Sequence, residues 1–236
     1  PKGVLGSSDR IRLLGKGRAE VPQQARTLAR WDDGSVRWAL LDFQTDGQSA
    51  CTVEYGRDVS RSQPDDPLDI VQSRTGITVA TGPIRVEFPK DRAVFPGIVS
   101  LRRPDGAYRR ITPDKPDPAV ALIAGDGERY GSVKPDAVVL EEAGPERACV
   151  RVNLTHRGEG GKALFRSTFR VHLFRNSGAV RVFHTFENDR TDEEFTPIRE
   201  LSLRAGLDVG ADPVGRIGRR RIGALKAQPV SLQQTH

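Results

Sequence analysis

The side chains in this sequence that could do chemistry gather around the stretch 179–188, which alternates in the manner of a β-strand. A period of two places His184 on one face of that strand and Arg181 on the other. In a functional interpretation, His184 contacts a sugar on a concave sheet, and Arg181 or Arg199 supplies positive charge to a carboxylate of that sugar. Asn188 is a further candidate by the same sheet geometry. The simpler alternative is a half-buried His184 that is hydrogen-bonded inside its sheet.

Tyr130 is the one tyrosine that we consider for chemistry, because the glycine-flanked segment GDGERYGS predicts a loop around it. Its alternative role is to anchor that loop. The sequence contains no phosphate-binding P-loop, no GxGxxG that opens a helix, no GxSxG and no HExxH. No residue can therefore be assigned a catalytic role by motif.

A metal site is not expected from the sequence. The spacing of His156, His172 and His184 does not resemble a zinc site, although three histidines on neighbouring strands could converge in space. The acidic pieces at 65–66 and 189–194 lack the regular oxygen spacing of a calcium-binding EF-hand loop. We expect no cofactor in this chain, and a calcium requirement is left open for a full-length protein.

The chain is basic, with a net charge of +6 that comes from 30 arginines and 7 lysines against 31 acidic residues. This charge favours anionic partners such as phosphate or uronate, although charge spread along a whole chain also serves plain solvation. The densest cluster lacks the interleaved aromatics or helical motif of a nucleic-acid-binding surface. Nucleic acid is therefore the least favoured partner. The cluster consists of Arg216, Arg219, Arg220 and Arg221.

No apolar run approaches the roughly 20 residues that a membrane helix needs, so no membrane partner is expected. The sequence shows no secretory signal, which leaves the compartment open because a signal could already have been removed. The chain has 236 residues, begins with Pro1 and contains no methionine. We therefore expect a processed chain or an excised piece of a longer protein.

Cys51 and Cys149 both lie in strand-like stretches. Two cysteines in a chain of this length make neither a disulfide framework nor a CxxC metal site. Two buried free thiols are the favoured interpretation, and one long-range disulfide between them is the alternative.

Strand patterns cover almost the entire sequence. An Asp33-Gly34 turn between alternating apolar runs predicts a tight hairpin, since glycine accepts the positive φ that such turns need. No stretch of ten residues repeats apolar residues at helical spacing, so the predicted fold class is all-β. Residues 112–136, rich in proline and glycine, are predicted to form a long irregular connection. Strands are expected at 10–14, 21–31, 35–43, 50–55, 76–80, 84–88, 98–102, 108–111, 138–142, 148–156, 163–175, 179–188 and 198–205.

The polar segment 57–70 has no periodicity and is rich in proline and aspartate, so we place a domain boundary there. The strands lengthen after residue 138, and turns at 158–162 and 176–178 predict that three of them form a meander. Long antiparallel strands are typical of large curved sheets with a concave face.

A resemblance to a known family rests on four segments of the first block and a weaker match later in the chain. The first four resemble the N-terminal barrel of the exo-acting rhamnogalacturonan lyase and YetA-like polysaccharide-processing family. Residues 138–205 are similar to the central sandwich of that family. The four segments are RLL at 12–14, EVPQQAR at 20–26, ARWDDGSVRW at 29–38 and LDF at 41–43.

This resemblance implies a small RIFT-type β-barrel at residues 1–65, which would lack its first strand, and a large antiparallel β-sandwich at 66–236. A C-terminal helical α/α toroid completes the family architecture and has no counterpart in the sequence, so a toroid is an expected partner. A secreted or periplasmic location is favoured over a cytoplasmic one.

The activity that the resemblance implies is β-elimination on acidic pectin-type glycans such as rhamnogalacturonan. Elimination at a uronate needs a base for the proton alpha to the carboxylate and a cation for the charge that results. Without the toroid we expect this chain alone to bind weakly and to turn over little or nothing. The alternative is a non-catalytic carbohydrate-binding or structural β module.

Overall fold

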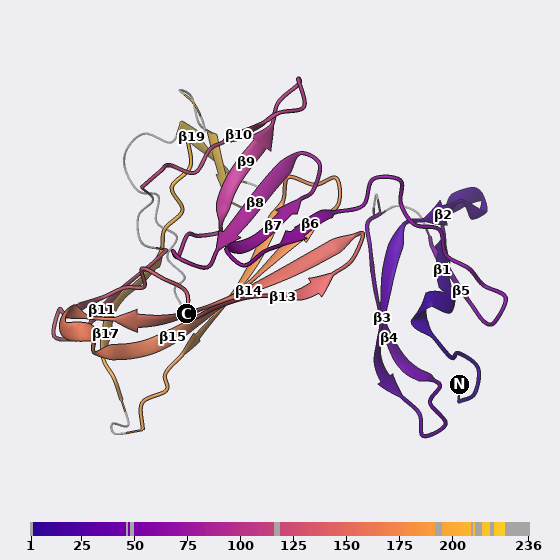
Figure 1. The fold of residues 1–236 in the computed structure, drawn as a ribbon, viewed down its shortest axis with the longest axis horizontal. Helices are drawn as coiled ribbons and strands as arrows, with labels where there is room; N and C mark the ends of the chain where they lie inside the picture. The colour runs from indigo at the N-terminus through magenta and orange to yellow at the C-terminus, as the bar shows by residue number, and fades with distance from the viewer. Residues whose placement is uncertain are drawn as a thin grey trace.

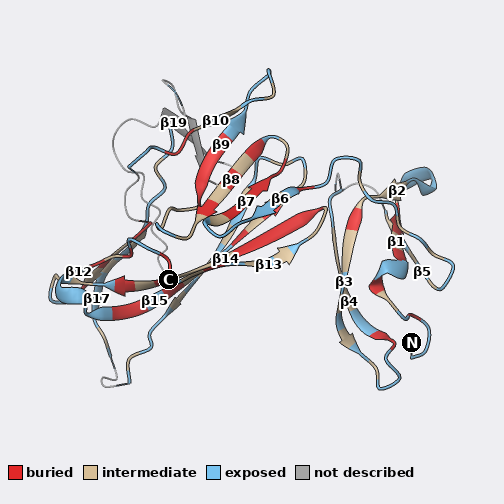
Figure 2. Ribbon diagram, in the orientation of Figure 1, coloured by how far each residue is buried: buried red, intermediate tan, exposed pale blue. Residues whose placement is uncertain are grey.

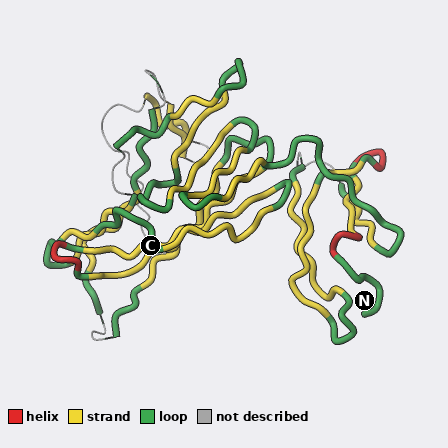
Figure 3. The backbone as a smooth tube through the Cα atoms, viewed as in Figure 1, coloured by secondary structure: helices red, strands yellow, loops and turns green. Residues whose placement is uncertain are grey.

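The computed structural model describes residues 2–45, 47, 50–115, 119–191, 195–208, 210, 214–217 and 220–224, the last two segments by their backbone alone. Regular structure in this described part consists of strands and short 3₁₀ turns, which confirms the predicted all-β class (Figure 3). The molecule is elongated, with an N-terminal unit at one end and a sandwich beside it (Figure 1). No helix in the described residues is long and apolar enough to cross a membrane.

The N-terminal unit contains short strands around a small core. Its elements are η1 (Ser8–Arg10), β1 (Ile11–Leu14), η2 (Lys16–Arg18), β2 (Glu20–Val21), β3 (Gln23–Arg30), β4 (Val36–Phe43) and β5 (Thr52–Tyr55). β1 pairs with β2 on one side and with β5 on the other, whereas β3 and β4 form a separate ribbon. Leu5, Ile11 and Val36 are buried together, and this core holds the ribbon against the three-stranded sheet.

The predicted hairpin at Asp33-Gly34 is confirmed. The N–H of Trp31 donates to the carbonyl of Ser35 at 2.8 Å, and the N–H of Gly34 donates back to Trp31 at 2.9 Å. Gly34 has a φ of +81°, which glycine adopts without a steric penalty. Oδ1 of Asp33 accepts from the N–H of Ser35 at 2.9 Å and from its hydroxyl at 2.5 Å. These bonds close the turn and lower the pKa of Asp33.

Two antiparallel sheets form the sandwich. The first has the order β10-β9-β8-β7-β6, and the second has the order β13-β14-β15-β16. Apolar residues of both sheets, among them Val86 and Val150, form one buried core (Figure 2). The first sheet consists of β6 (Asp69–Gln72), β7 (Gly76–Ala80), β8 (Ile84–Pro89), β9 (Ile98–Arg102) and β10 (Tyr108–Arg110). The second consists of β13 (Ala137–Ala143), β14 (Arg147–Arg157), β15 (Ala163–Phe174) and β16 (Val180–Glu187), with η3 (Glu159–Gly161) between β14 and β15.

The four-stranded sheet has an inner face on the core and an outer face toward solvent. β14, β15 and β16 are consecutive neighbours, which confirms the predicted meander. The register sets Phe169 opposite His184 on the inner face and His172 opposite Arg181 on the outer face. In β16, half-buried and exposed residues alternate without a break, so the period-two pattern of the sequence is retained in the structure.

The predicted irregular connection at 112–136 is wrong, because it contains two strands. β11 (Val120–Ala124) pairs with β12 (Arg129–Tyr130) and with β17 (Ile198–Leu203) in a three-stranded sheet. The partner of β11 lies far along the chain, and no local pattern indicates such a pairing. Tyr130 is therefore in a strand and not in the predicted loop.

The arginine cluster of the sequence falls on the last described pair of strands, β18 (Val214–Ile217) and β19 (Arg220–Ala224). Only the backbone of this pair is described, and Arg219 lies outside the described residues. The structure therefore adds nothing to the charge argument made for this cluster.

Cys51 and Cys149 are both described, and no disulfide joins them. Cys149 is buried, and that burial together with the nearby Glu141 and Glu142 raises the pKa of its thiol to about 11. Cys51 is half-buried. The prediction of two thiols is confirmed, and full burial applies to Cys149 alone.

Arg147 joins the N-terminal unit to the sandwich. Its Nε and Nη2 donate to the two carboxylate oxygens of Asp42 in β4, at 2.9 and 3.0 Å. Its Nη1 donates to Nδ1 of His172 at 2.7 Å, and Glu142 forms an ion pair with the same guanidinium. Only 10% of the Arg147 side chain is exposed, so its charge is compensated by protein groups from three strands.

A second contact between the units lies beside Arg147. Oε1 of Gln24 in β3 accepts from the backbone N–H groups of Glu146 at 3.0 Å and of Arg147 at 2.8 Å. Gly144 permits this approach, because a Cβ at that position would collide with the amide group of Gln24. The end of the β3–β4 ribbon is therefore fixed to the start of β14.

Replacing Arg147 with alanine is expected to lower the free energy of unfolding by about 3 kcal/mol, because Asp42 and Glu142 would lose their shared cation in a largely buried setting. Urea denaturation followed by circular dichroism measures this change. Arg204→Ala is the control, since its exposed pair with Glu200 at 3.8 Å should contribute less than about 1 kcal/mol. Equal losses in both variants would contradict the role given to Arg147.

Candidate functional site

A groove of about 870 Å³ lies where the end of β4 meets the turn between β15 and β16. The two sides of the groove belong to the two units of the molecule, and Asp42 both lines it and binds Arg147. The contact that joins the units therefore also forms the groove. The lining consists of residues 41–45 on one side and residues 174, 177 and 179–182 on the other.

Arg181 is the cation of this groove. Its guanidinium carbon lies 5.7 Å from the ring centroid of Phe174, and no carboxylate of the described residues pairs with it. Arg151 and Arg170, on the same outer face, instead share the carboxylate of Glu141 at N–O distances of 2.7 Å. Arg181 is thus available to an anionic ligand in a way that these two arginines are not.

Phe183 extends the surface beyond Arg181 along β16. Its side chain is 54% exposed, and its ring meets that of His172 edge-on at a centroid distance of 5.3 Å. A fixed apolar ring of this kind can pack against the C–H face of a sugar while Arg181 holds a carboxylate. Cation and ring together give the outer face the chemistry to bind an acidic sugar.

His172 lies opposite Arg181 in the ladder, yet neither of its ring nitrogens is available as a base. Nδ1 accepts from Arg147, and Nε2 lies 3.8 Å from Sγ of Cys149. Burial and the neighbouring positive charge of Arg147 lower the pKa of His172, which disfavours the protonated ring. Asp42 has both oxygens bound by Arg147. Arg147 therefore engages both of these groups.

His184 occupies the inner face of β16. Its Nε2 lies 2.8 Å from the hydroxyl of Ser167, which also contacts Nε2 of His156 at 2.8 Å. Its ring stacks on Phe169 at a centroid distance of 4.5 Å, and burial lowers its pKa. This is the half-buried, hydrogen-bonded arrangement of the simpler alternative, and the sheet separates His184 from Arg181.

Tyr130, Asn188 and Arg199 are not brought to the groove. Tyr130 is buried near the far end of the sandwich, and its hydroxyl donates to Glu128 at 2.6 Å, which with burial raises the pKa of Tyr130 to about 12. Oδ1 of Asn188 accepts from a backbone N–H two residues on, at 3.1 Å. Arg199 in β17 donates to the carbonyl of Gly125 at 3.2 Å. Of the five sequence candidates, Arg181 alone lines the groove.

The described residues contain no group of three or more His, Cys, Asp or Glu side chains placed to hold a metal ion. The convergence considered for the histidines is partial, because Ser167 bridges His156 and His184 on the inner face, whereas His172 lies on the outer face.

Sequence reasoning missed Phe174 and Phe183 as candidate binding residues, and it missed the contact of Arg147 with Asp42. The alternation of β16 already placed Phe183 on the face of Arg181, so this signal was present. The pairing of Arg147 with Asp42 joins residues 105 positions apart, and no sequence signal marks it.

Comparison with known families agrees with this architecture. A model described as the PcRGLX-like N-terminal RIFT barrel domain matches residues 1–55, and one described as the PcRGLX-like protein central beta sandwich domain matches residues 68–216. The chain therefore belongs to the PcRGLX-like family, which is related to rhamnogalacturonan lyase. The N-terminal unit is a RIFT-type barrel, residues 68–216 match the central sandwich, and the resemblance seen in the sequence is confirmed.

The chain is also similar to a protein of Bacillus subtilis (strain 168) named "Uncharacterized protein YetA". The two are 25% identical over 231 residues, which cover 91% of this chain and 25% of YetA. The chain thus spans about a quarter of the length of this relative. The domain limits 1–65 and 66–236 stay a prediction.

The buried His156 makes the stability of the fold sensitive to acid. Its side chain is fully buried, and burial, followed by the neighbouring His184, lowers its pKa to about 4 from an ordinary 6.5. Between pH 6.5 and 4 the unfolded chain binds a proton that the folded chain excludes, so stability should fall by about 3 kcal/mol across this window. Thermal unfolding at stepped pH measures this loss.

The variant His156→Gln keeps a side chain that can hydrogen-bond Ser167 but cannot take up the proton. Its stability should therefore change less over the same pH window than that of the unsubstituted chain. An unchanged slope in His156→Gln would show that other groups cause the acid sensitivity.

Proposed function

We propose that this chain is the β portion of a polysaccharide lyase-like protein that acts on acidic pectin-type glycans such as rhamnogalacturonan. In this proposal the groove holds a uronate of the glycan through Arg181. The observation that carries the proposal is a guanidinium without a carboxylate partner, beside an exposed phenylalanine, at the junction of two units. The relation of the family to rhamnogalacturonan lyase supports the choice of glycan.

The chemistry would divide between this chain and the rest of a longer protein. β-Elimination removes the proton alpha to the uronate carboxylate and needs a cation where the negative charge develops. Arg181 would bind the carboxylate and stabilise that charge, and Phe183 would orient the ring. Because Arg147 engages both His172 and Asp42, the base would come from outside this groove.

The engagement of His172 and Asp42 also favours a second candidate function. A non-catalytic carbohydrate-binding module needs the cation and the ring but no base. The two candidates predict the same binding behaviour for this chain, and they differ in whether a longer protein that contains it produces unsaturated uronate.

Arg181→Ala is expected to weaken binding of a galacturonate oligomer to the chain by about tenfold or more, because a charge-assisted hydrogen bond contributes roughly 1.5–3 kcal/mol. Isothermal titration calorimetry at low salt measures the affinity. Arg109→Ala is the control with the same change in charge, since Arg109 is exposed and pairs with Asp208 at 3.7 Å outside the groove. Equal affinities of the two variants would count against the groove.

Phe183→Ala should weaken binding of the same oligomer while leaving the fold intact, because the ring is exposed and the main core lies on the other face of the sheet. Phe183→Tyr keeps the flat ring and should retain most of the affinity. If the alanine variant binds as well as the unsubstituted chain, the ring does not contact the sugar.

Elimination is tested with a longer protein that contains this segment, incubated with rhamnogalacturonan while the absorbance of unsaturated uronate is followed. The proposal predicts a signal somewhere between pH 5 and 9, measured with and without calcium, and its loss in Arg181→Ala. Binding without any such signal would favour the module. A helical toroid partner and a secreted or periplasmic location belong to the same proposal.

A further inference from the structure

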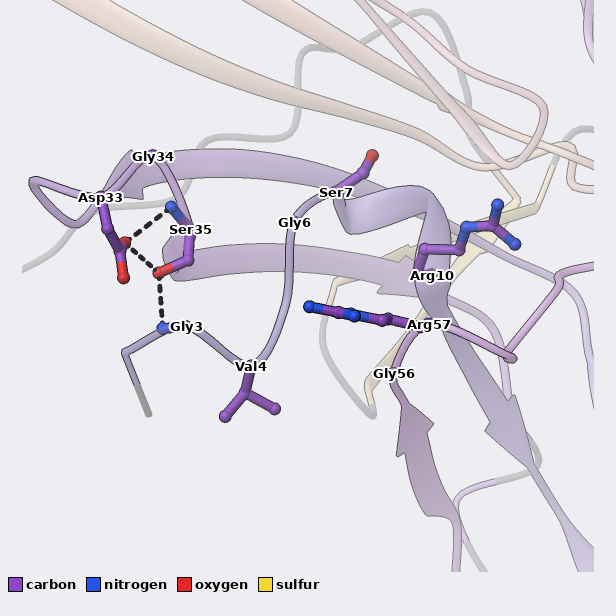
Figure 4. Close-up of a pocket in the computed structure, with 10 residues that line it drawn as sticks. All are labelled: Gly3, Val4, Gly6, Ser7, Arg10, Asp33, Gly34, Ser35, Gly56 and Arg57. Atoms are coloured by element: carbon purple, nitrogen blue, oxygen red, sulfur yellow. Dashed lines mark hydrogen bonds between the residues drawn. The ribbon is translucent and has the colours of Figure 1, made fainter.

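We infer that the barrel carries a second binding site, for a hydroxylated carboxylate such as a single uronate residue, in the pocket of Figure 4. The pocket has a volume of about 510 Å³, within the roughly 300–1,000 Å³ that small-molecule sites occupy. It is lined entirely by residues of the N-terminal unit and of the turn that follows β5. None of these residues lines the groove at Arg181.

The ladder of β1 and β5 brings Arg10 and Arg57 into the lining of this pocket, with their side chains extending in different directions. The N–H of Gly56 donates to the carbonyl of Arg10 at 3.1 Å, so Arg57 follows directly beside Arg10. Nη1 of Arg10 donates to the carbonyl of Val59 at 3.4 Å, and neither guanidinium pairs with a carboxylate of the described residues. In Figure 4 the side chain of Arg57 extends toward the segment that contains Val4.

Arg10 and Arg57 differ in this respect from the nearby Arg12 of β1 and Arg18 of η2. Arg12 and Arg18 share the carboxylate of Glu54 at N–O distances of 2.7 and 2.5 Å, so their charge is already compensated. Arg57 has no such carboxylate among the described residues, so a bound anion would compensate its charge. The Arg57 side of the pocket is therefore suited to a carboxylate.

The opposite side of the pocket offers an acceptor. Asp33 stands there with Ser35, and the two bonds from Ser35 to Oδ1 hold the carboxylate in place (Figure 4). Its Oδ2 accepts no hydrogen bond from the described residues, and the lowered pKa of Asp33 keeps it ionised. A ligand with a carboxylate at one end and hydroxyl groups at the other fits this arrangement of charges, whereas a compact dianion does not.

Glycines form much of the wall between the two sides. A Cβ at Gly6, Gly34 or Gly56 would meet no atom within 4 Å, so there is open space beside the backbone at these positions. A sugar ring could lie against this bare backbone without displacing a side chain. An added side chain at Gly6 would instead extend into the space that the ring needs.

The test is a titration of the 236-residue chain, labelled with ¹⁵N, with D-galacturonate, D-galactose and inorganic phosphate in turn. The structure predicts that galacturonate shifts the amide signals of Gly3, Gly6 and Gly56 and binds about tenfold or more tightly than the other two ligands. Arg57→Ala should lower the affinity for galacturonate by about tenfold or more. Asp33→Asn keeps an oxygen that can accept from Ser35 but removes the charge. It should lower the affinity for galacturonate as well.

Three results would overturn the inference. Equal affinities for phosphate and galacturonate would reduce the pocket to a general anion site, and unchanged shifts in Arg57→Ala would place the ligand elsewhere. The absence of any galacturonate binding would also contradict the inference. Arg181→Ala should leave these amide shifts unchanged, so that failure of this site can be distinguished from failure of the proposed groove. Circular dichroism confirms the fold of each variant.

Discussion

The contact between Arg147 and Asp42 is the interaction on which the arrangement of this molecule depends. A cation that is 10% exposed is tolerated because two carboxylates and an imidazole from three different strands face it. Each of these partners is held by its own strand, so the guanidinium fixes the end of β4 against the sandwich. The groove at the junction follows from that placement, since Asp42 is one of its walls.

The same charge pairing explains which arginines are available for binding. Most arginines of the outer face are compensated by acidic neighbours, as Arg151 and Arg170 are by Glu141. Arg181 and Arg57 lack such a partner in the described residues, and each lines a pocket. A high net charge therefore says less about ligands than the position of a cation that lines a pocket without a carboxylate partner.

The sequence was sufficient for much of the architecture, because local rules decide it. The alternation of β16 and the hairpin at Asp33-Gly34 each depend on only a few neighbouring residues, and both predictions are confirmed. β11 was missed because its main partner is β17, and that pairing gives no local pattern. The site was harder to predict for the same reason, since the groove joins β4 to β16. Arg181 was found by its residue type, whereas its neighbour Phe174 was not.

The central claim is that Arg181 and Phe183 hold an acidic sugar at the junction of barrel and sandwich. A crystal structure of the chain with a bound galacturonate oligomer tests this most directly. The account predicts a sugar carboxylate within hydrogen-bonding distance of the guanidinium of Arg181 and a ring packed on Phe183. An oligomer bound instead at the far end of the sandwich, near Tyr130 and Arg199, with the groove empty, would contradict it.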